Sequence, residues 1–385
     1  MAAEVAANHG ARVDLYDAMP SVGRKFLVAG KSGLNLTHDE NLDPFLARYS
    51  GKELPNELWR KIIAAFDNTK LRKWAAELGI DTFVASSGKV FPSPDNGSIK
   101  AAPLLRRWIK QLRQLGVTFH TRHRWIGLNN PQQFTFEHQD QIVCANPDIT
   151  ILALGGASWP QTGSDGHWTE LLTRHGINIT PLTSANCGWG VDWPPELLEN
   201  AEGMPLKNLV LKAGSESRHG ELVITRHGLE GGPLYHLGPC IRGLQHAQIE
   251  IDFKPDLSAD ELAKRMGKVR RNFVREARRR WKLDPATCAI LKHMPGRGPW
   301  KSVRQLAKEV KHCCIPLTKP RPIEETISSA GGVCWEELDD SLMLKKLPSI
   351  HVAGEMIDWE APTGGYLMQA CLATGAYAAH KALRT

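Results

Sequence analysis

The chain has 385 residues, of which 42% are hydrophobic and 23% are charged, with a formal net charge of +7 and eight cysteines. This length suits two or three domains, and no stretch approaches the roughly 18 apolar residues that a membrane span needs. The first residues carry no basic leader and the cysteines have no CxxC spacing. We therefore expect a cytoplasmic protein with reduced, mostly buried thiols and no metal site.

The first 17 residues predict a helix followed by a strand. "AAEVAANHG" is typical of a helix that stops at Gly10, and "ARVDLYD" alternates in the manner of a strand that closes at Asp17. A helix followed by a strand with an acidic tip is the second half of a dinucleotide-binding βαβ unit. From the spacing of the acidic residue, we expect the first half, an apolar strand and a GxGxxG turn, directly before Met1.

Residues 1–179 alternate between helical and strand patterns. "LRKWAAELGI" and "LLRRWIKQLRQLG" place apolar residues on one helical face and end in glycine. "VTFHTRHRWIGL", "QFTFEH", "QIVCA" and the apolar run "ITILALGG" follow as strand candidates. Strand alternation would place His120 and His123 on opposite faces, which argues against a shared metal ion. The alternation of helices and strands predicts α/β organisation for residues 1–179.

The pattern then changes twice before it returns. Residues 180–256 hold short strands and turn residues, which predict an inserted β-rich domain. A capping box at Ser258 and Glu261 begins a helical subdomain that runs over 257–312. Residues 313–325 then return to the β-rich domain, and 326–385 return to the strand, glycine turn and helix style of the first part.

A basic stretch lies in the helical subdomain. "KRMGKVRRNFVREARRRWK" predicts one helix whose apolar stripe runs from Met266 to Trp281, with Arg and Lys on the other faces. Such a surface could contact nucleic-acid phosphates. We favour a solvated face over a nucleic-acid partner, because no aromatic platform or binding motif accompanies the charges.

Glycine pairs after apolar strands carry the strongest functional signal. Gly155 and Gly156 follow "ITILAL", and Gly364 and Gly365 open a helix in "HVAGEMIDWEAPTGGYLMQACLATG". Backbone N–H groups at a helix start are unpaired and carry the positive end of the helix dipole, which favours phosphates and other electron-rich groups. The alternative interpretation is that paired glycines merely allow a tight turn.

Three segments resemble motifs of one flavoprotein family. "GRKFLVAGKSGLNLTH" is similar to GRK(L)xxxGxGxxNxT, "GGASWPQTGSDG" to GGxSxPxTGSxG, and "AGEMIDWEAPTGGYLMQA" to AGExxDxxGxxGGYNxQ. These are patterns of the aminoacetone oxidase family of FAD-binding proteins, which includes dehydro-bile-acid reductase-like enzymes. The resemblance implies an α/β fold, with a discontinuous glutathione-reductase-like FAD-binding Rossmann domain, an inserted β-rich domain and a helical subdomain.

Carried over residue by residue, the resemblance also implies a cofactor site. Asp17 would hydrogen-bond the adenosine ribose, and Arg24 and Lys25 would lie along the FAD phosphates and ribityl chain. The other positions are Gly30, Gly33 and Asn35 at the flavin, Gly155 and Gly156 at the adenine, and Gly354, Glu355, Gly364, Gly365, Met368 and Gln369 at the ribityl and isoalloxazine end.

The largest departure from the family is at the start of the sequence, which lacks the N-terminal strand and glycine-rich turn. Two further departures lie within the motifs. Lys31 adds a side chain where close backbone approach is expected, and Leu367 and Met368 stand where an Asn is usual. Both departures lie within the implied flavin end of the site.

Together these patterns predict an oxidoreductase in which FAD exchanges hydride at its N5 atom. NAD(P)H is a candidate electron donor, and reduction of an activated C=C bond and oxidation of a small amine by oxygen both stay open. Spacing assigns no catalytic residue. We expect a small-molecule substrate and no membrane partner. The sequence does not predict the oligomeric state. Two other hypotheses stay open: a truncated or mis-started copy with weak or no FAD binding, and a nucleic-acid-associated flavoprotein.

Overall fold

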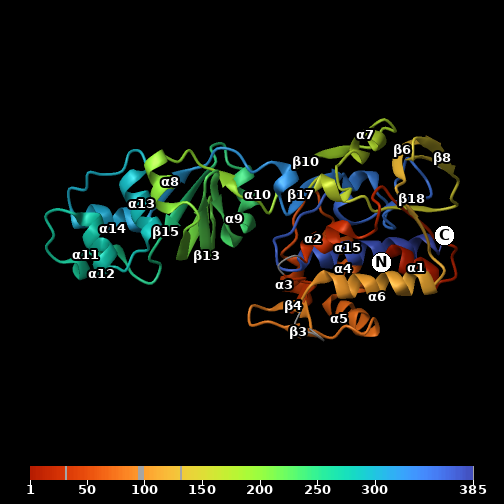
Figure 1. Cartoon of the computed structure of the whole chain (residues 1–385), viewed down its shortest axis with the longest axis horizontal. Helices are drawn as coiled ribbons and strands as arrows, with labels where there is room; N and C mark the ends of the chain where they lie inside the picture. The colour runs from red at the N-terminus through yellow and green to blue at the C-terminus, as the bar shows by residue number, and fades with distance from the viewer. Residues whose placement is uncertain (31–32, 94–98, 131, 385) are drawn as a thin grey trace. The chain divides into compact units, whose positions relative to one another are not determined.

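The computed structural model describes residues 1–30, 33–93, 99–130 and 132–384 (Figure 1). The chain forms two compact units. Unit 1 comprises Met1–Thr183 and Ile327–Thr385, and unit 2 comprises Ser184–Thr326. The chain therefore leaves unit 1 once and returns to it, so that residues from both ends of the sequence share one core.

Unit 1 combines helices with pairs of parallel strands. Its helices are α1 (Ala2–Asn8), α2 (Arg24–Ala29), α3 (Leu42–Leu46), α4 (Asn56–Ala65), α5 (Asn68–Glu77), α6 (Ala101–Gln114), α7 (Trp168–Thr173) and α15 (Tyr366–Ala382). Strand β1 (Asp14–Asp17) pairs in parallel with β5 (Thr118–Thr121), and β9 (Thr150–Leu152) pairs in parallel with β18 (Ile350–Val352). Parallel strands joined through helices agree with the α/β pattern of the sequence.

Among the described residues, two short antiparallel sheets and one further pair of strands complete unit 1. One contains β2 (Thr37–His38), β4 (Lys89–Pro92) and β3 (Thr82–Val84), in that order, and another contains β6 (Arg124–Asn130), β7 (Gln133–His138) and β8 (Gln141–Ala145). Strand β10 (Ile179–Ala185) pairs with β17 (Ser328–Val333). These last two strands border the excursion of the chain into unit 2.

Helix α15 lies in the core of unit 1, where Figure 1 shows it between the N-terminal helices and the strands. It packs against α1, α4, β2, β9 and β18, and 12 of its 17 residues are buried. Its six alanines favour the helical conformation and have small side chains, so neighbouring backbones come close to the helix. The helix begins directly after Gly365, which places the predicted GG pair at its N-terminus.

The segment "VTFHTRHRWIGL" forms two strands instead of one. Strand β5 ends at Thr121 and β6 begins at Arg124, and Arg122 between them has a φ of 62°. The turn brings the rings of His120 and His123 to 5.6 Å between centroids. The expectation that these histidines lie on opposite faces of a strand is therefore wrong, because left-handed backbone at Arg122 leaves His120 in β5 and His123 in the connection to β6.

Unit 2 contains one six-stranded antiparallel sheet and a group of helices. The strand order is β11 (Trp189–Gly190), β14 (Gly228–Glu230), β13 (Glu216–Thr225), β12 (Pro205–Ala213), β15 (Gln248–Asp252) and β16 (Cys313–Pro316). The helices are α8 (Pro195–Ala201), α9 (Gly232–His236), α10 (Gly238–Arg242), α11 (Ala259–Met266), α12 (Phe273–Arg280), α13 (Pro285–His293) and α14 (Val303–Lys311). The sheet and helices share one apolar core.

The basic stretch does not form the single helix that its apolar spacing predicts. Helix α11 ends at Met266 and α12 begins at Phe273, and Gly267 and Asn272 between them have φ values of 62° and 56°. Left-handed backbone at both residues interrupts the helical hydrogen bonding. The capping box predicted at the start of α11 is confirmed: the Ser258 side chain accepts from the backbone of Glu261, and the Glu261 carboxylate accepts from the backbone of Ser258.

All eight cysteines are free thiols, but most of them are not fully buried. Cys187, Cys288 and Cys313 are buried, Cys144 and Cys314 are exposed, and the other three are half-buried. The expectation of mostly buried thiols is wrong in this respect, because several lie on edge strands or at the site described next.

Candidate functional site

The three predicted motifs converge on one charged cluster in unit 1. The Nζ atom of Lys25 on α2 donates to the Ser164 hydroxyl at 3.0 Å and to Oε2 of Glu355 at 2.9 Å. A Cβ on Gly155 would lie 2.8 Å from the Ser164 hydroxyl. Residues separated by up to 330 positions thus meet at the starts of α2 and of the turn η4 (Gly354–Met356).

Asp17 and Arg24, two further residues of the predicted cofactor site, interact electrostatically with each other. The Oδ1 atom of Asp17, at the end of β1, accepts from the backbone N–H of Met19 at 2.8 Å. Burial raises the pKa of Asp17, while the Met19 hydrogen bond and the charge of Arg24 partly oppose this. Arg24 itself donates from Nε to the Ser21 hydroxyl at 3.1 Å.

Some of the predicted glycines are required for packing. A Cβ on Gly30 would overlap Ala101 at the start of α6, and one on Gly156 would overlap the Ser329 hydroxyl. Gly33 has a φ of 142°, which favours glycine whether or not a ligand is near. Lys31, where the sequence departs from the family motif, lies outside the described residues.

Hydrogen bonds with two neighbouring segments fix the backbone at Gly354. The backbone N–H of Gly354 donates to the Thr374 hydroxyl at 2.9 Å, and the Trp359 indole donates to the Gly354 carbonyl at 2.8 Å. At the start of α15, Gly365 lies so close to β2 that a Cβ would be 2.6 Å from backbone atoms of Thr37. Gly364 precedes it with a φ of 131°. The contact of Gly365 with Thr37 brings the first and third motifs together.

Buried polar atoms without hydrogen-bond partners belong to the first and third motifs. Within the described part of the chain, Asn35 Oδ1, Thr37 Oγ1 and Gln369 Oε1 are buried and make no hydrogen bond. Thr37 and Gln369 are 0% exposed, and Nε2 of Gln369 is already used by the Phe66 carbonyl at 2.5 Å. Buried polar groups are rarely left unpaired, because each costs about 1–3 kcal/mol. Their position fits a bound ligand rich in hydrogen-bonding groups, as FAD is.

Met368 has a different environment from its predicted neighbours. Its side chain packs against the apolar cluster that includes Leu34, Leu36 and Leu104. The structure therefore places Met368 with the core, and Asn35 and Gln369 with the unpaired polar atoms.

Next to these atoms stands a group of polar side chains that the sequence did not single out. The Glu40 carboxylate accepts from both Nε and Nη2 of Arg48, at 3.2 and 2.5 Å, and its charge acts on the nearby Tyr366 hydroxyl. The Arg48 guanidinium lies 5.9 Å from the centroid of the Tyr366 ring. His38 stacks on the same ring, with centroids 5.4 Å apart and planes at 16°.

Charge and burial set the protonation states of this group. Burial disfavours the charged form of Glu40, but the hydrogen bonds and charge of Arg48 prevail and lower the Glu40 pKa. Burial and, secondly, the negative charge of Glu40 raise the pKa of Tyr366. The phenol therefore keeps its proton at neutral pH, beside a permanently charged guanidinium.

His38 presents one nitrogen without a partner. Its Nε2 faces the Ser87 carbonyl at 3.0 Å, which assigns the proton of the neutral ring to Nε2. Its Nδ1 makes no hydrogen bond and lies 3.7 Å from Oε1 of Glu40. The group of His38, Glu40, Arg48 and Tyr366 is thus a preformed acid–base cluster at the start of α15.

Sequence reasoning missed these four residues and Thr37, although a signal existed. Thr37 and His38 end the quoted motif "GLNLTH", and Tyr366 follows the GG pair directly. Glu40 and Arg48 carry no motif signal. The two residues flank α3, which brings their side chains together.

A protein-family model for the HI0933-like protein Rossmann domain matches residues 1–381. The chain belongs to this family. The resemblance to FAD-binding Rossmann oxidoreductases that the three motifs predict is confirmed at this level.

Two curated relatives match nearly the full length of this HI0933-like chain. The 3-dehydro-bile acid delta(4,6)-reductase of Clostridium scindens is 25% identical, covering 95% of this chain and 91% of the relative. The ribosomal RNA dihydrouridine synthase of Escherichia coli K12 is 21% identical, covering 95% and 90%.

Two solved structures share the fold. The open conformation of a flavocytochrome c3 fumarate reductase has a TM-score of 0.52 at 13% identity and covers all of this chain and 76% of that one. The 3-ketosteroid delta1-dehydrogenase of Sterolibacterium denitrificans has a TM-score of 0.51 at 11% identity, covering 100% and 97%. The predicted α/β class with a Rossmann-type domain is confirmed.

Across the described residues, no helix has both the length and the apolar character required to cross a bilayer.

Proposed function

We propose that this chain uses FAD to reduce a carbon–carbon double bond conjugated to a carbonyl group in a small molecule. The observation that carries the proposal is the Tyr366 phenol, protonated and held by Glu40 and Arg48 next to three unpaired buried polar atoms. The names of both curated relatives support the same reaction type: one is a delta(4,6)-reductase, and dihydrouridine is uridine with its C5–C6 double bond saturated.

FAD would be held by residues that the structure brings together. Lys25 supplies positive charge for the phosphates, and the N–H groups that follow Gly364 and Gly365 lie at the positive end of α15. Asn35, Thr37 and Gln369 supply unpaired polar atoms. When bound, reduced FAD would supply a hydride to the substrate, and we propose NAD(P)H as the donor that would reduce FAD.

The chain itself would supply the proton. Adding hydride to the β-carbon of the conjugated bond leaves an electron pair at the α-carbon, and the Tyr366 hydroxyl is the proposed donor of the proton that takes it. The phenolate left behind lies beside Arg48, whose positive charge partly offsets the burial and the negative charge of Glu40 that raise the pKa of the phenol. His38 stacks on the ring and limits its movement.

The reaction is tested with Tyr366→Phe in the FAD-loaded protein. Stopped-flow spectroscopy would follow reduction of the flavin by NADH or NADPH and its reoxidation by cyclohex-2-enone and a 4-en-3-one steroid. We expect the variant to bind FAD and accept hydride normally, but to be reoxidised by the enone about 100-fold or more slowly.

Tyr377→Phe is the matched control, because it removes another hydroxyl of α15 whose partner is the Asp340 carbonyl. It should leave both rates unchanged. Equal enone rates in Tyr366→Phe and wild type would refute the proton-donor role. Rapid flavin reduction by a small amine, with reoxidation by oxygen and none by enones, would assign amine oxidation, the alternative class.

The cofactor site is tested separately with Thr37→Val. This change removes an unpaired hydroxyl without changing the shape of the side chain, so the free protein should be as stable as wild type or more stable. FAD affinity should fall roughly tenfold in a fluorescence titration, as expected for one lost hydrogen bond. Thr287→Val is the control, because the Thr287 hydroxyl on α13 donates to the carboxylate of Asp284, the residue before that helix. It should lower stability and leave FAD affinity unchanged.

We also propose a cytoplasmic location, since all eight cysteines are free thiols, as expected in a reducing compartment. The narrower assignment to the aminoacetone oxidase group stays a prediction.

A further inference from the structure

Positive charge is concentrated in the helices of unit 2. From the start of α11 to the end of α14, residues 259–311 contain 16 Lys and Arg but five Asp and Glu, a formal charge of +11. The whole chain carries +7, so the remainder is net negative. Within residues 264–282 alone, ten Lys and Arg accompany a single carboxylate, that of Glu276. The charge is therefore local to this region.

The five carboxylates of the region do not neutralise it. Glu261 and Asp284 accept backbone hydrogen bonds at the starts of α11 and α13. Glu276 pairs with two arginines of its own helix, and Glu309 pairs with Arg297. Four of the five are thus committed to contacts within the fold, and most of the cations have no partner there.

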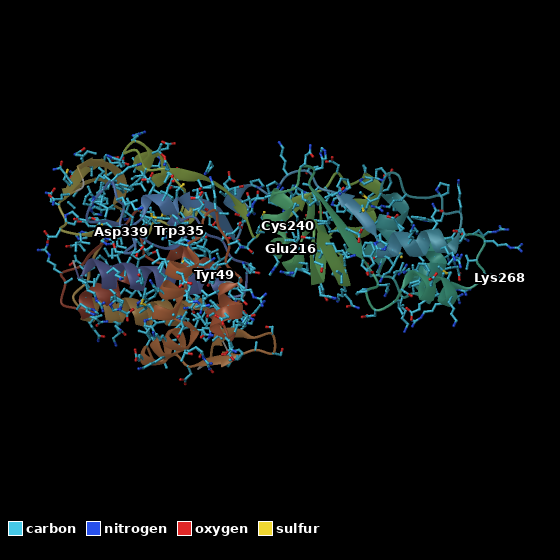
Figure 2. The ribbon with its side chains drawn as sticks, turned by 180° about the vertical axis from the view of Figure 1, so that it is seen from behind. Tyr49, Glu216, Cys240, Lys268, Trp335 and Asp339 are labelled. Carbon is cyan, nitrogen blue, oxygen red and sulfur yellow. The ribbon has the colours of Figure 1, made fainter. Side chains whose placement is uncertain are left out.

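Six exposed cations form what we term the basic surface: Lys264, Arg265, Lys268, Arg270, Arg271 and Arg275. They come from the end of α11, the start of α12 and the segment between, and these two helices pack against each other. In the part of the chain that the structure describes, no carboxylate lies within 4.0 Å of any of the six. Figure 2 shows Lys268 at the tip of this region, where side chains project outward.

This arrangement has a cost that the fold does not offset. Like charges four residues apart destabilise a helix, as at Arg275 and Arg279 of α12, and a concentration of one sign of charge repels itself. The break between α11 and α12 adds cations at a turn, where they contribute no helical packing. A binding partner of opposite charge would relieve this repulsion.

The surroundings of the cations narrow the class of partner. None of the large exposed apolar side chains of the described chain lies in residues 259–311, so the surface offers nothing to insert into a membrane. Protein interfaces also have a desolvated core with few charges, which this surface lacks. Contacts to nucleic-acid phosphates need only exposed cations, and they need no aromatic platform when the bases are not read.

We propose that the basic surface binds the phosphate backbone of a nucleic acid without reading its sequence. The absence of an aromatic platform, which favours a solvated face when the sequence is considered alone, fits backbone binding equally well. The uncompensated positive charge and its exposure favour a surface that binds the nucleic-acid backbone over a face that is only solvated. The proposal concerns unit 2 and is independent of the reaction proposed for unit 1.

The test measures binding of the full chain to labelled nucleic acid by fluorescence anisotropy over a range of salt concentrations. The probes are a single-stranded RNA of about 20 nucleotides, its RNA duplex and DNA of the same sequence. Wild type should bind with a micromolar dissociation constant that weakens steeply with salt. Arg270→Gln, Arg271→Gln and Arg275→Gln combined should weaken binding tenfold or more and lower the slope of log K against log salt by about 2.

A triple variant of unit 1, with Lys61, Arg106 and Lys110 changed to Gln, removes the same charge from exposed positions of α4 and α6. It should bind nearly as wild type does. The variant of the basic surface should melt at or above the wild-type temperature, because repulsion is removed, so unfolding cannot account for its lost affinity. The three probes also show which nucleic acid is preferred.

Three results would overturn the proposal. The first is the absence of salt-dependent binding by wild type to any of the probes, and the second is an equal loss of affinity in the unit 1 control. The third is displacement of the probe by polyglutamate at equal charge concentration, which would assign the surface to an acidic protein instead.

Discussion

Replacing Gly365 by alanine should damage the stability of unit 1 and its FAD binding together. Gly365 has a φ of 97°, a conformation that side chains disfavour, and its Cβ would lie 2.6 Å from backbone atoms of Thr37. Backbone atoms cannot rotate away as the end of a flexible side chain can. The start of α15 and strand β2 must therefore move apart, which displaces Tyr366 and Thr37 from each other.

Two contributions set the size of the effect. The left-handed conformation costs about 1–2 kcal/mol for a residue with a Cβ. Forcing one extra carbon into a packed contact costs about 1–3 kcal/mol. Gly365→Ala should therefore lower the free energy of unfolding by about 2–5 kcal/mol, which corresponds to a fall in melting temperature of roughly 4–20 °C for a unit of this size.

Gly116→Ala separates the two contributions. Gly116, after α6, has a φ of 82°, and no atom lies within 4 Å of the position of its Cβ. It should show the conformational cost alone, about 1–2 kcal/mol, with unchanged FAD affinity. Calorimetry gives the stabilities and flavin fluorescence the affinities, where Gly365→Ala should bind FAD tenfold or more weakly. Equal stability losses and equal FAD affinities in the two variants would refute the reasoning.

Three further predictions concern buried or titrating groups. Glu4→Ala should lower the free energy of unfolding by about 3 kcal/mol in urea titrations, because it leaves two indole N–H groups and one side-chain amide without their acceptor; a loss below about 1 kcal/mol would contradict this. The folded-state pKa of Glu40 lies below its ordinary value of 4.5, so its contribution is complete above that pH and is lost as pH falls through the folded pKa. Urea titrations at several pH values should show Glu40→Gln with a shallower acid-side loss of stability, and parallel curves would be the contrary outcome. Burial raises the pKa of Cys371 to about 12, so iodoacetamide should modify the exposed Cys144 and Cys314 well before Cys371 in peptide mass mapping of the native protein.

Local structure in this chain follows from short-range sequence. The capping box at Ser258 and Glu261 and the helix that ends before Gly79 depend on hydrogen bonds and backbone preferences of neighbouring residues, so the sequence alone predicts them. The three ordered motifs likewise predict the family and the Rossmann-type domain. The five-part division of the chain and the cofactor roles carried over from the resemblance stay predictions.

Other features depend on contacts between distant parts of the chain. Periodicity predicts one helix through the basic stretch, but left-handed backbone at Gly267 and Asn272 divides it. Spacing likewise predicts one strand through His120 and His123, where the chain turns instead. The spacing of apolar residues shows which of them can lie on one face of a helix or strand. A turn that keeps the same residues in the core leaves this spacing unchanged, so the spacing does not predict the turn.

The acid–base cluster was decided by tertiary structure alone. Glu40 and Tyr366 are more than 300 positions apart, and the site exists because α15 begins against β2 at a glycine. The motifs determined which residues are present and that a glycine pair opens the last helix. Which side chains meet there depends on the packing of α15 among the N-terminal helices, because hydrogen bonds and charge pairing act over a few ångströms in space and carry no trace in local sequence spacing.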